Sequence, residues 1–259
     1  MIAMKTNKYK VDAPPRNKPL TNSRLPYGDL ILGIGRLFIN IPYKAETLEG
    51  AGREKLIVNI SAFDCTTFVE TVLALAKCTA TGNISPNQVS KNLKLIRYRH
   101  GKIEGYSSRL HYFTDWLRDN EKKGVLTDVS RSIGGKPQRK KINFMTAHRE
   151  LYAALAKEAQ LAKMLMVEKS LSRKVFYIIG TDKVNSKITK IKNGDIIAFA
   201  TNQEGLDVAH VGFALWQGKS LRLLHASSKD GAVVISTKTL TDYLKSNKKV
   251  TGIIVARPK

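Results

Sequence analysis

The order of the apolar patterns along this chain limits its fold more than any other feature. In the last third, apolar residues form strand-length segments, and the turn signals Asn193-Gly194, Gln217-Gly218 and Asp230-Gly231 separate several of them. The predicted strands are Val175–Ile179, Asp195–Thr201, His210–Trp216, Leu221–Ser227, Ala232–Ser236 and Val250–Ala256. Earlier residues repeat at helical spacing instead. Helices followed by a run of antiparallel strands predict an α+β domain.

Four helices are predicted before these strands. They cover residues 30–38, 64–78, a segment from Ser107 or Ser108 to Gly124, and residues 143–168. The last is interpreted as one long helix whose apolar face carries Phe144, His148, Leu151, Leu155, Ala159 and Ala162. The segment Ser130–Lys141 is rich in Gly, Lys and Arg and is predicted to be an exposed loop.

Residues 1–29 differ in composition from the rest of the chain. They contain four of the eight prolines and six Lys or Arg residues, which predicts a poorly ordered basic arm. Nothing in the composition divides the remaining residues, so 30–259 are predicted to form one domain. The first residues of the sequence, Met1–Lys5, lack the apolar core of a signal peptide, as expected of a cytoplasmic protein or of one whose signal has been removed.

The charge of the chain is unusual, because 44 Lys and Arg face 21 Asp and Glu, for a net charge of +23. Such an excess favours polyanionic partners: nucleic acid, anionic lipid surfaces or anionic cell-wall polymers. Aromatic residues make up only 7% and are not interleaved with basic ones, so no specific nucleic-acid site is predicted. No apolar run reaches the roughly 18 to 20 residues of a transmembrane helix.

The two cysteines, Cys65 and Cys78, fall in one predicted helix, which separates them by about 20 Å at a rise of ~1.5 Å per residue. No disulfide is therefore expected, and two cysteines alone do not hold a structural zinc. Cys65 would lie in the first helical turn, where the helix dipole lowers a thiol pKa and favours a reactive thiolate. The alternative, a small buried apolar residue, suits Cys78 well.

A helix start is indicated by the residues around Cys65. Asp64 can cap the helix, and Thr67 with Glu70 supports an N-terminal capping pattern. Downstream, a two-residue turn at Gly218-Lys219 would pair two strands and place Ser227 opposite His210. His225 would then share a sheet face with His210. Two such histidines can act as a base and its orienting group, or can be structural.

The remaining histidines are weaker candidates. His148 is expected in the core and His100 in solvent. His111 lies with Arg109 near a predicted helix start, where an anionic ligand could bind. The alternative for His111 is a pair on the helix surface with Asp115, four residues on.

Four short motifs then resemble a known family. They are Pro42-Tyr43, Phe63–Val69, His210-Val211-Gly212 and His225-Ala226-Ser227. Their order and spacing are similar to those of the NlpC-like papain-fold cell-wall cysteine hydrolases. The chain departs from the usual pattern at Thr66-Thr67, where most relatives have Ser-Gly. This departure, the segment around Arg109 and the helical insertion resemble the N-acetylmuramoyl-L-alanine amidase-like branch.

The resemblance implies a papain-like fold in which the nucleophile helix packs on an antiparallel sheet. It also implies catalytic roles for three residues: Cys65 as nucleophile, His210 as general base and acid, and His225, or its neighbour Ser227, as the group that orients His210. The backbone amide of Cys65 would contribute to an oxyanion hole. The positions that would line the substrate cleft are Tyr43, Asp64, Arg109 and His111.

The branch is expected to cut the amide between N-acetylmuramic acid, preferably in its anhydro form, and L-alanine, without a metal or organic cofactor. A stem-peptide endopeptidase or an acyltransferase of the same fold remains an alternative. A basic polyanion-binding protein with an inert cysteine is another. A cell-wall substrate predicts a location in the cell envelope, with the periplasm favoured and the cytoplasm as the alternative. Muropeptides or peptidoglycan would be the partners, together with anionic envelope surfaces.

Overall fold

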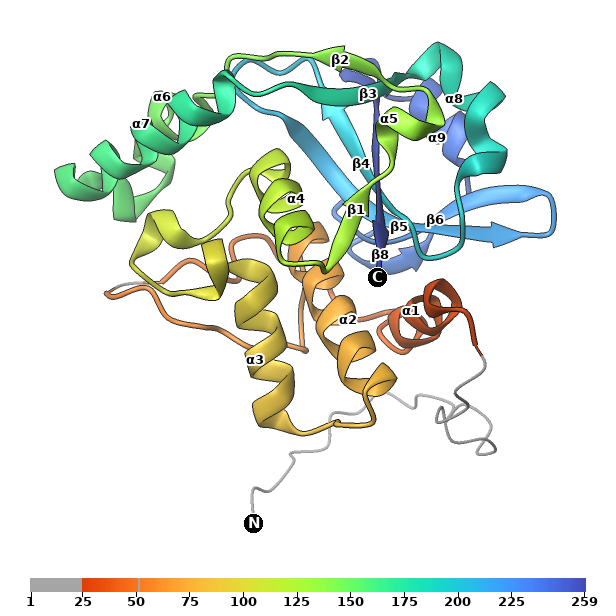
Figure 1. Ribbon diagram of the computed structural model, residues 1–259, viewed down its shortest axis with the longest axis horizontal. Helices are drawn as coiled ribbons and strands as arrows, with labels where there is room; N and C mark the ends of the chain where they lie inside the picture. The colour runs from red at the N-terminus through yellow and green to blue at the C-terminus, as the bar shows by residue number, and fades with distance from the viewer. Residues whose placement is uncertain (1–24, 51) are drawn as a thin grey trace.

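A computed structural model describes residues 25–50 and 52–259 of the protein. Its centre is one antiparallel sheet with the strand order β2-β3-β8-β4-β5-β6-β7, and β1 pairs with β8 as well (Figure 1). The strands are β1 Leu126–Asp128, β2 Lys136–Gln138, β3 Phe176–Gly180, β4 Ile196–Thr201, β5 Val208–Gln217, β6 Ser220–Ser227, β7 Ala232–Ile235 and β8 Val250–Pro258. The mixed α+β class predicted from the sequence is confirmed.

The six strands predicted in the last third all form, and their ends shift by at most two residues. Short, nearly continuous apolar runs bounded by turn residues located them, because a strand that is buried on both sheet faces is apolar on both sides. The two short strands β1 and β2 were not predicted. β2, together with α5 (Ser130–Ile133), lies in the segment expected to be a loop, so that expectation was wrong.

One face of the sheet carries α1 (Tyr27–Arg36), α2 (Cys65–Ala80), α3 (Pro86–Arg97) and α4 (Phe113–Lys122). Apolar side chains of these helices and of β4, β5, β6 and β8 form the largest buried cluster. The sequence interpretation missed α3. Its start carries clear signals, since Pro86 is at the first helical position and Ser85 Oγ accepts a hydrogen bond from the Gln88 amide at 3.2 Å.

The opposite face packs against α8 (Thr181–Lys187) and α9 (Leu240–Lys245). A third buried cluster joins the segment before α4 to α6 (Phe144–Ala147) and α7 (Glu158–Ser172), which project from the sheet edge. Among residues 25–50 and 52–259, no helix combines the length and the apolarity needed to cross a bilayer.

The single long helix predicted for residues 143–168 is wrong. The chain instead forms α6, two short 3₁₀ turns and α7. Thr146 donates its backbone amide to Glu168 Oε1 at 3.1 Å and its hydroxyl to the same carboxylate. In a straight helix, 22 residues at ~1.5 Å each would separate these groups by about 33 Å. The buried carboxylate therefore requires the chain to fold back.

Two other helices begin at residues that differ from the predicted ones. The helix expected from Ser107 or Ser108 begins only at Phe113, after a 3₁₀ turn at Tyr106–Ser108. The helix expected from Leu30 begins at Tyr27, so the last three residues of the predicted arm 1–29 are helical. Most of that arm, residues 1–24, lies outside the described residues.

Candidate active site

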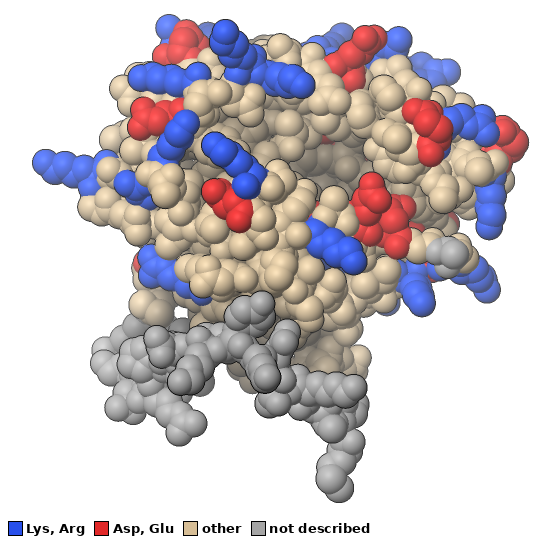
Figure 2. All heavy atoms as spheres, turned by 180° about the vertical axis from the view of Figure 1, so that it is seen from behind, with Lys and Arg blue, Asp and Glu red and all other residues tan. Residues whose placement is uncertain are grey.

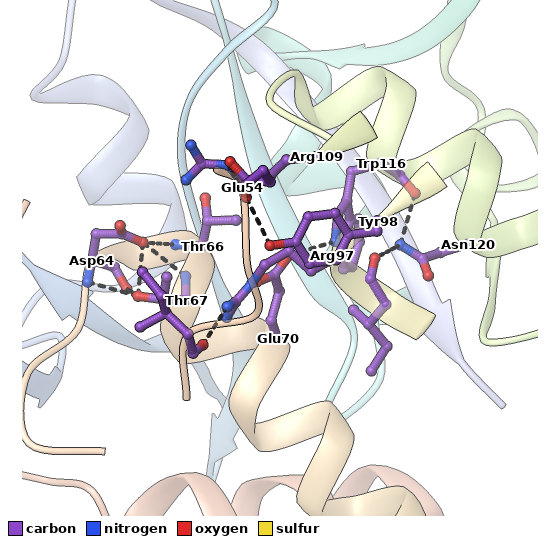
Figure 3. A network of polar contacts seen from close by, with 12 residues as sticks. Glu54, Asp64, Thr66, Thr67, Glu70, Arg97, Tyr98, Arg109, Trp116 and Asn120 are labelled. Carbon is purple, nitrogen blue, oxygen red and sulfur yellow. Dashed lines mark hydrogen bonds and ion pairs between the residues drawn. The ribbon is translucent and has the colours of Figure 1, made fainter. Parts of the chain in front are cut away.

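Cys65 is the first residue of α2, and the cap of this helix is formed locally. Asp64 accepts hydrogen bonds from the amides of Thr66 at 2.9 Å and Thr67 at 2.7 Å (Figure 3). Thr67 Oγ1 accepts from the Asp64 amide at 3.0 Å in return, which completes a capping box. The capping prediction is confirmed for Asp64 and Thr67. These contacts hold Cys65 where helix amides are unpaired.

Glu70 has a different role from the one predicted. Its carboxylate accepts from Arg97 Nε at 2.6 Å and from the Trp116 indole at 3.2 Å, and both carboxylate and guanidinium are buried. Arg97 also donates to the carbonyl of Ile57 at 2.6 Å. This network connects α2 to the end of α3, to the first turn of α4 and to the loop before Cys65 (Figure 3). Glu70 therefore joins α2 to its neighbouring helices and does not cap the start of α2.

β5 carries His210 and, one residue further on, Val211. A hydrogen bond joins the backbone of Val211, the residue after His210, to the Cys65 side chain. His225 lies towards the C-terminal end of β6. The hairpin that joins β5 and β6 pairs Gln217 with Ser220, as predicted. A Cβ on Gly212 would lie 2.8 Å from Cβ of His225, so only glycine allows the two strands to approach here.

The two histidines form a direct pair. His210 Nε2 lies 2.7 Å from His225 Nδ1, and the ring planes are at 80°. The prediction that they share a sheet face is confirmed. When His210 donates through Nε2, its Nδ1 is free to accept a proton. Ser227 is engaged elsewhere, since its hydroxyl donates to Asp230 Oδ2 at 2.6 Å. His225, not Ser227, contacts His210.

Burial decides the charge of these groups. It lowers the pKa of His210 to about 3, with a smaller effect from His225, and it lowers the pKa of His225 to about 4. Burial, followed by the negative charge of Asp64, raises the pKa of Cys65 to about 11. The bond from Val211 opposes that shift without cancelling it. The expected lowered thiol pKa is therefore wrong, because desolvation outweighs the helix dipole.

Tyr43 lies close to the segment that carries Cys65. A β-bridge to Phe63 and a hydrogen bond from the Tyr43 amide to the carbonyl of Gly231 at 2.8 Å hold Tyr43 in this position. Burial raises the pKa of Tyr43, with smaller contributions from Cys65 and Asp64.

Tyr243 was missed by the sequence interpretation. Its ring from α9 lies 6.4 Å from His210 and 6.0 Å from His225 between centroids. A cavity of about 180 Å³ opens between His210 and Tyr243. Tyr243 carries no motif or periodic pattern in the sequence that would link it to the histidines, so only the fold identifies it.

Arg109 lies elsewhere, at a cavity of about 390 Å³ that is also lined by Glu49, Glu54 and Tyr106. The residue is only 5% exposed, and its guanidinium contacts Glu49 at 2.8 Å and Glu54 at 3.4 Å. Tyr98 donates its hydroxyl to Glu54 at 2.7 Å (Figure 3). The positive charge of Arg109 is thus already shared by two carboxylates of the chain.

His111 is not paired with Asp115 as the alternative prediction had it, and its place in the substrate cleft stays a prediction. Its Nε2 lies 2.9 Å from the carbonyl of Tyr106, and burial, then Arg109, lowers its pKa to about 3. The neutral ring donates to that carbonyl and offers no charge to an anion. Asp115, its alternative partner, is paired with Arg99 at 2.7 Å instead.

The other cysteine and histidines carry no site. Cys78 is buried and both cysteines are free, as expected. His100 is exposed, as predicted, whereas His148 is only partly buried and stacks on Phe144 rather than lying in the core. Among the described residues, no group of three His, Cys, Asp or Glu side chains is arranged to hold a metal ion.

Comparison with known proteins gives this geometry a context. A family model described as AmiA-like, N-acetylmuramoyl-L-alanine amidase-like, matches residues 33–253. A solved N-acetylmuramoyl-L-alanine amidase from Bacteroides uniformis ATCC 8492 is 43% identical, with a TM-score of 0.86 over 90% of this chain and 99% of its own. A search of curated protein sequences found no match.

Two further solved structures are similar. One, described as a putative xylanase from Bacteroides fragilis, is 44% identical, with a TM-score of 0.83 over 87% of this chain and 99% of its own. A Legionella pneumophila protein is 23% identical, with a TM-score of 0.67 over 90% of this chain and 89% of its own, and shows the fold alone. From the family match and the 43% identity, the chain belongs to the AmiA-like family of N-acetylmuramoyl-L-alanine amidase-like proteins.

Proposed function

We propose that the protein is a cysteine amidase that cuts the bond between N-acetylmuramic acid and L-alanine in peptidoglycan fragments. One observation carries this proposal: a thiol at a helix start lies against the strand residue that follows His210, and His210 is hydrogen-bonded to His225. A nucleophile, a base and an orienting group are the parts that acyl transfer needs. The same arrangement supports a papain-like fold of the NlpC type.

The neutral pair sets the order of proton movements. Cys65 Sγ attacks the amide carbonyl while His210 accepts the thiol proton, so that no stable thiolate is required beforehand. His210 then protonates the leaving nitrogen as the C–N bond breaks, which leaves a thioester on Cys65. Water, deprotonated by His210, hydrolyses the thioester and restores the thiol. The unpaired amide at the start of α2 would stabilise the oxyanion.

The identity of the substrate is proposed from the family to which the chain belongs. The amidase from Bacteroides uniformis is described by the muramoyl–alanine bond, and this chain aligns with nearly all of it. We take the same bond as the target here, with the anhydro form of the muramoyl sugar as the preferred substrate. Tyr43 and Asp64, which flank Cys65, would contact the reacting end of the muropeptide. The cavity at Arg109 is the other part of the proposed cleft.

Product analysis of a defined anhydro-muropeptide tests the proposal. An amidase releases the intact stem peptide and the free anhydro sugar, which mass spectrometry distinguishes by mass. A shortened stem peptide with L-alanine still on the sugar would show an endopeptidase instead. The protein with Cys65→Ala is the matched control. Absence of product from both the muropeptide and intact peptidoglycan, with folded protein, would overturn the proposal.

The location and the charge form a linked part of the proposal. A peptidoglycan substrate places the protein in the cell envelope, most simply the periplasm, and fractionation of the source cells tests this. Lys and Arg are spread over the face seen in Figure 2, with Asp and Glu among them, rather than gathered in one patch. We therefore propose diffuse attraction to anionic envelope surfaces. Retention on such surfaces that does not weaken with salt would contradict it.

A further inference from the structure

The cavity beside His210 is defined by a mixture of catalytic and polar side chains. Its volume is about 180 Å³, and the residues that line it include His210, Tyr243, Ser228, Lys229 and Asn247. We call it the histidine-side cavity. It is separate from the cavity at Arg109, which shares none of these residues.

The reaction places one particular part of the substrate at this cavity. His210 must protonate the leaving nitrogen, and a proton donor has to come within about 3 Å of the atom that receives the proton. The group attached to that nitrogen therefore begins at His210. Because the histidine-side cavity also begins at His210, it is the space next to the leaving group, and the muramoyl part must extend in another direction.

Lys229 provides a positive charge at this cavity that the chain does not use. It lies in the turn between β6 and β7, and its side chain is exposed. In the part of the chain that the structure describes, Lys229 has no salt bridge. Its neighbour Asp230 is engaged with Ser227, whose hydroxyl donates to Oδ2 at 2.6 Å. The ammonium group is therefore available to an anionic ligand.

The leaving group of the proposed reaction is an anionic peptide. In a stem peptide, L-alanine is followed by D-glutamate, which continues the chain through its γ-carboxyl and keeps its α-carboxylate. This carboxylate is the first charge after the scissile nitrogen, and two extended residues reach at most about 7 Å. Lys229 follows Ser227 by the same two residues, and both residues line the histidine-side cavity together with His210.

We propose that the histidine-side cavity is the leaving-group subsite and that Lys229 binds the free α-carboxylate of the D-glutamate residue. The inference rests on the proposed amidase function, since it takes the leaving nitrogen to be that of L-alanine. It makes Lys229 a specificity-determining residue. A substrate whose D-glutamate α-carboxylate is amidated has the same shape and no charge, so Lys229 distinguishes the two.

The test compares two muropeptides that differ only in this carboxylate. The wild-type protein is expected to favour the free acid over the amide by about fivefold in kcat/KM, the upper range for an exposed ion pair. Lys229→Met should reduce this ratio to about one, and Lys229→Arg should retain it. Lys219→Met, in the turn at the opposite end of β6, should keep the wild-type ratio. An unchanged ratio in Lys229→Met overturns the inference.

A binding measurement separates this inference from the proposed function. The free stem peptide and its amidated form are titrated into the Cys65→Ala protein by calorimetry. Tighter binding of the free acid, lost in Cys65→Ala/Lys229→Met, supports the subsite even when turnover is measured at another bond. Equal binding of the two peptides overturns the inference, whereas failure to release stem peptide from a muropeptide overturns only the proposed function.

Discussion

At Cys65, His210 and His225, burial leaves three titratable groups uncharged at neutral pH, whereas Arg109 remains charged between the carboxylates of Glu49 and Glu54. A neutral thiol or imidazole can lie in an apolar environment without a charged partner, and a guanidinium cannot. The first region therefore needs no charged partner from the chain. In the second, each charge is already paired within the chain.

The largest effect expected from this comparison is at Cys65. Cys65→Ala should lower amidase turnover at least about 10⁴-fold, as removal of a nucleophile does in other acyl-transfer enzymes. The thermal unfolding midpoint should change little, because a partly buried thiol is replaced by a smaller side chain at a well-capped helix start. Turnover assays and circular dichroism check both statements. Retained turnover in this variant would remove Cys65 from the mechanism.

Local signals in the sequence predicted the first region well. The cap at Asp64 located Cys65, and period-two alternation with the Gly218-Lys219 turn placed His210 and His225 on one face. These signals act over a few residues. The thiol pKa could not be predicted in the same way, because the desolvation that raises it comes from distant elements packed around the thiol.

The second region shows why the rest was not predicted. The partners of Arg109 lie 55 and 60 residues earlier, in a segment without periodicity, so the sequence could not show that its charge is occupied. The broken helix at 143–168 has the same origin, since the contact between Thr146 and Glu168 is tertiary. His111 was assigned to an anion site because its burial, and hence its neutral state, was invisible.

Alkylation of Cys65 tests the neutral state directly. Because the pKa of its thiol is raised to about 11, the thiolate fraction should grow with pH through the whole range below that value. The rate with iodoacetamide should therefore rise about tenfold per pH unit, or roughly 10³-fold from pH 6 to 9. Peptide mass mapping separates Cys65 from the buried Cys78. A rate that is already on a plateau at pH 6 would show a thiolate–imidazolium pair instead.

His225 should have a smaller effect than the nucleophile. When His210 Nε2 donates to His225 Nδ1, His210 is held in the tautomer whose Nδ1 accepts a proton. His225→Ala should therefore lower kcat by about 10² to 10³-fold, with KM nearly unchanged. His225→Asn, whose amide oxygen can accept the same hydrogen bond, should recover part of the loss. Equal losses in the two variants would mean that His225 only fills space.

The smallest effect is expected at Arg109. Unlike the variants above, Arg109→Met should lower the free energy of unfolding by an amount that depends on pH. Burial raises the pKa of Glu54, and Arg109 opposes this rise. Arg109→Met should raise it further, so that the folded protein binds a proton more tightly than the unfolded chain does. Such a group destabilises the folded state above its folded pKa, and the penalty disappears as the carboxyl is protonated at lower pH.

The deficit of Arg109→Met should therefore be about 3 kcal/mol at pH 7, the cost of leaving a buried carboxylate unpaired, and should shrink towards pH 4. Urea unfolding at both pH values measures it. Glu54→Gln in the same background is the matched control, since it removes the carboxylate that the lost guanidinium neutralised and should restore stability at pH 7. A deficit that is independent of pH, and not relieved by Glu54→Gln, would show that Arg109 acts by packing over Tyr106 rather than by charge.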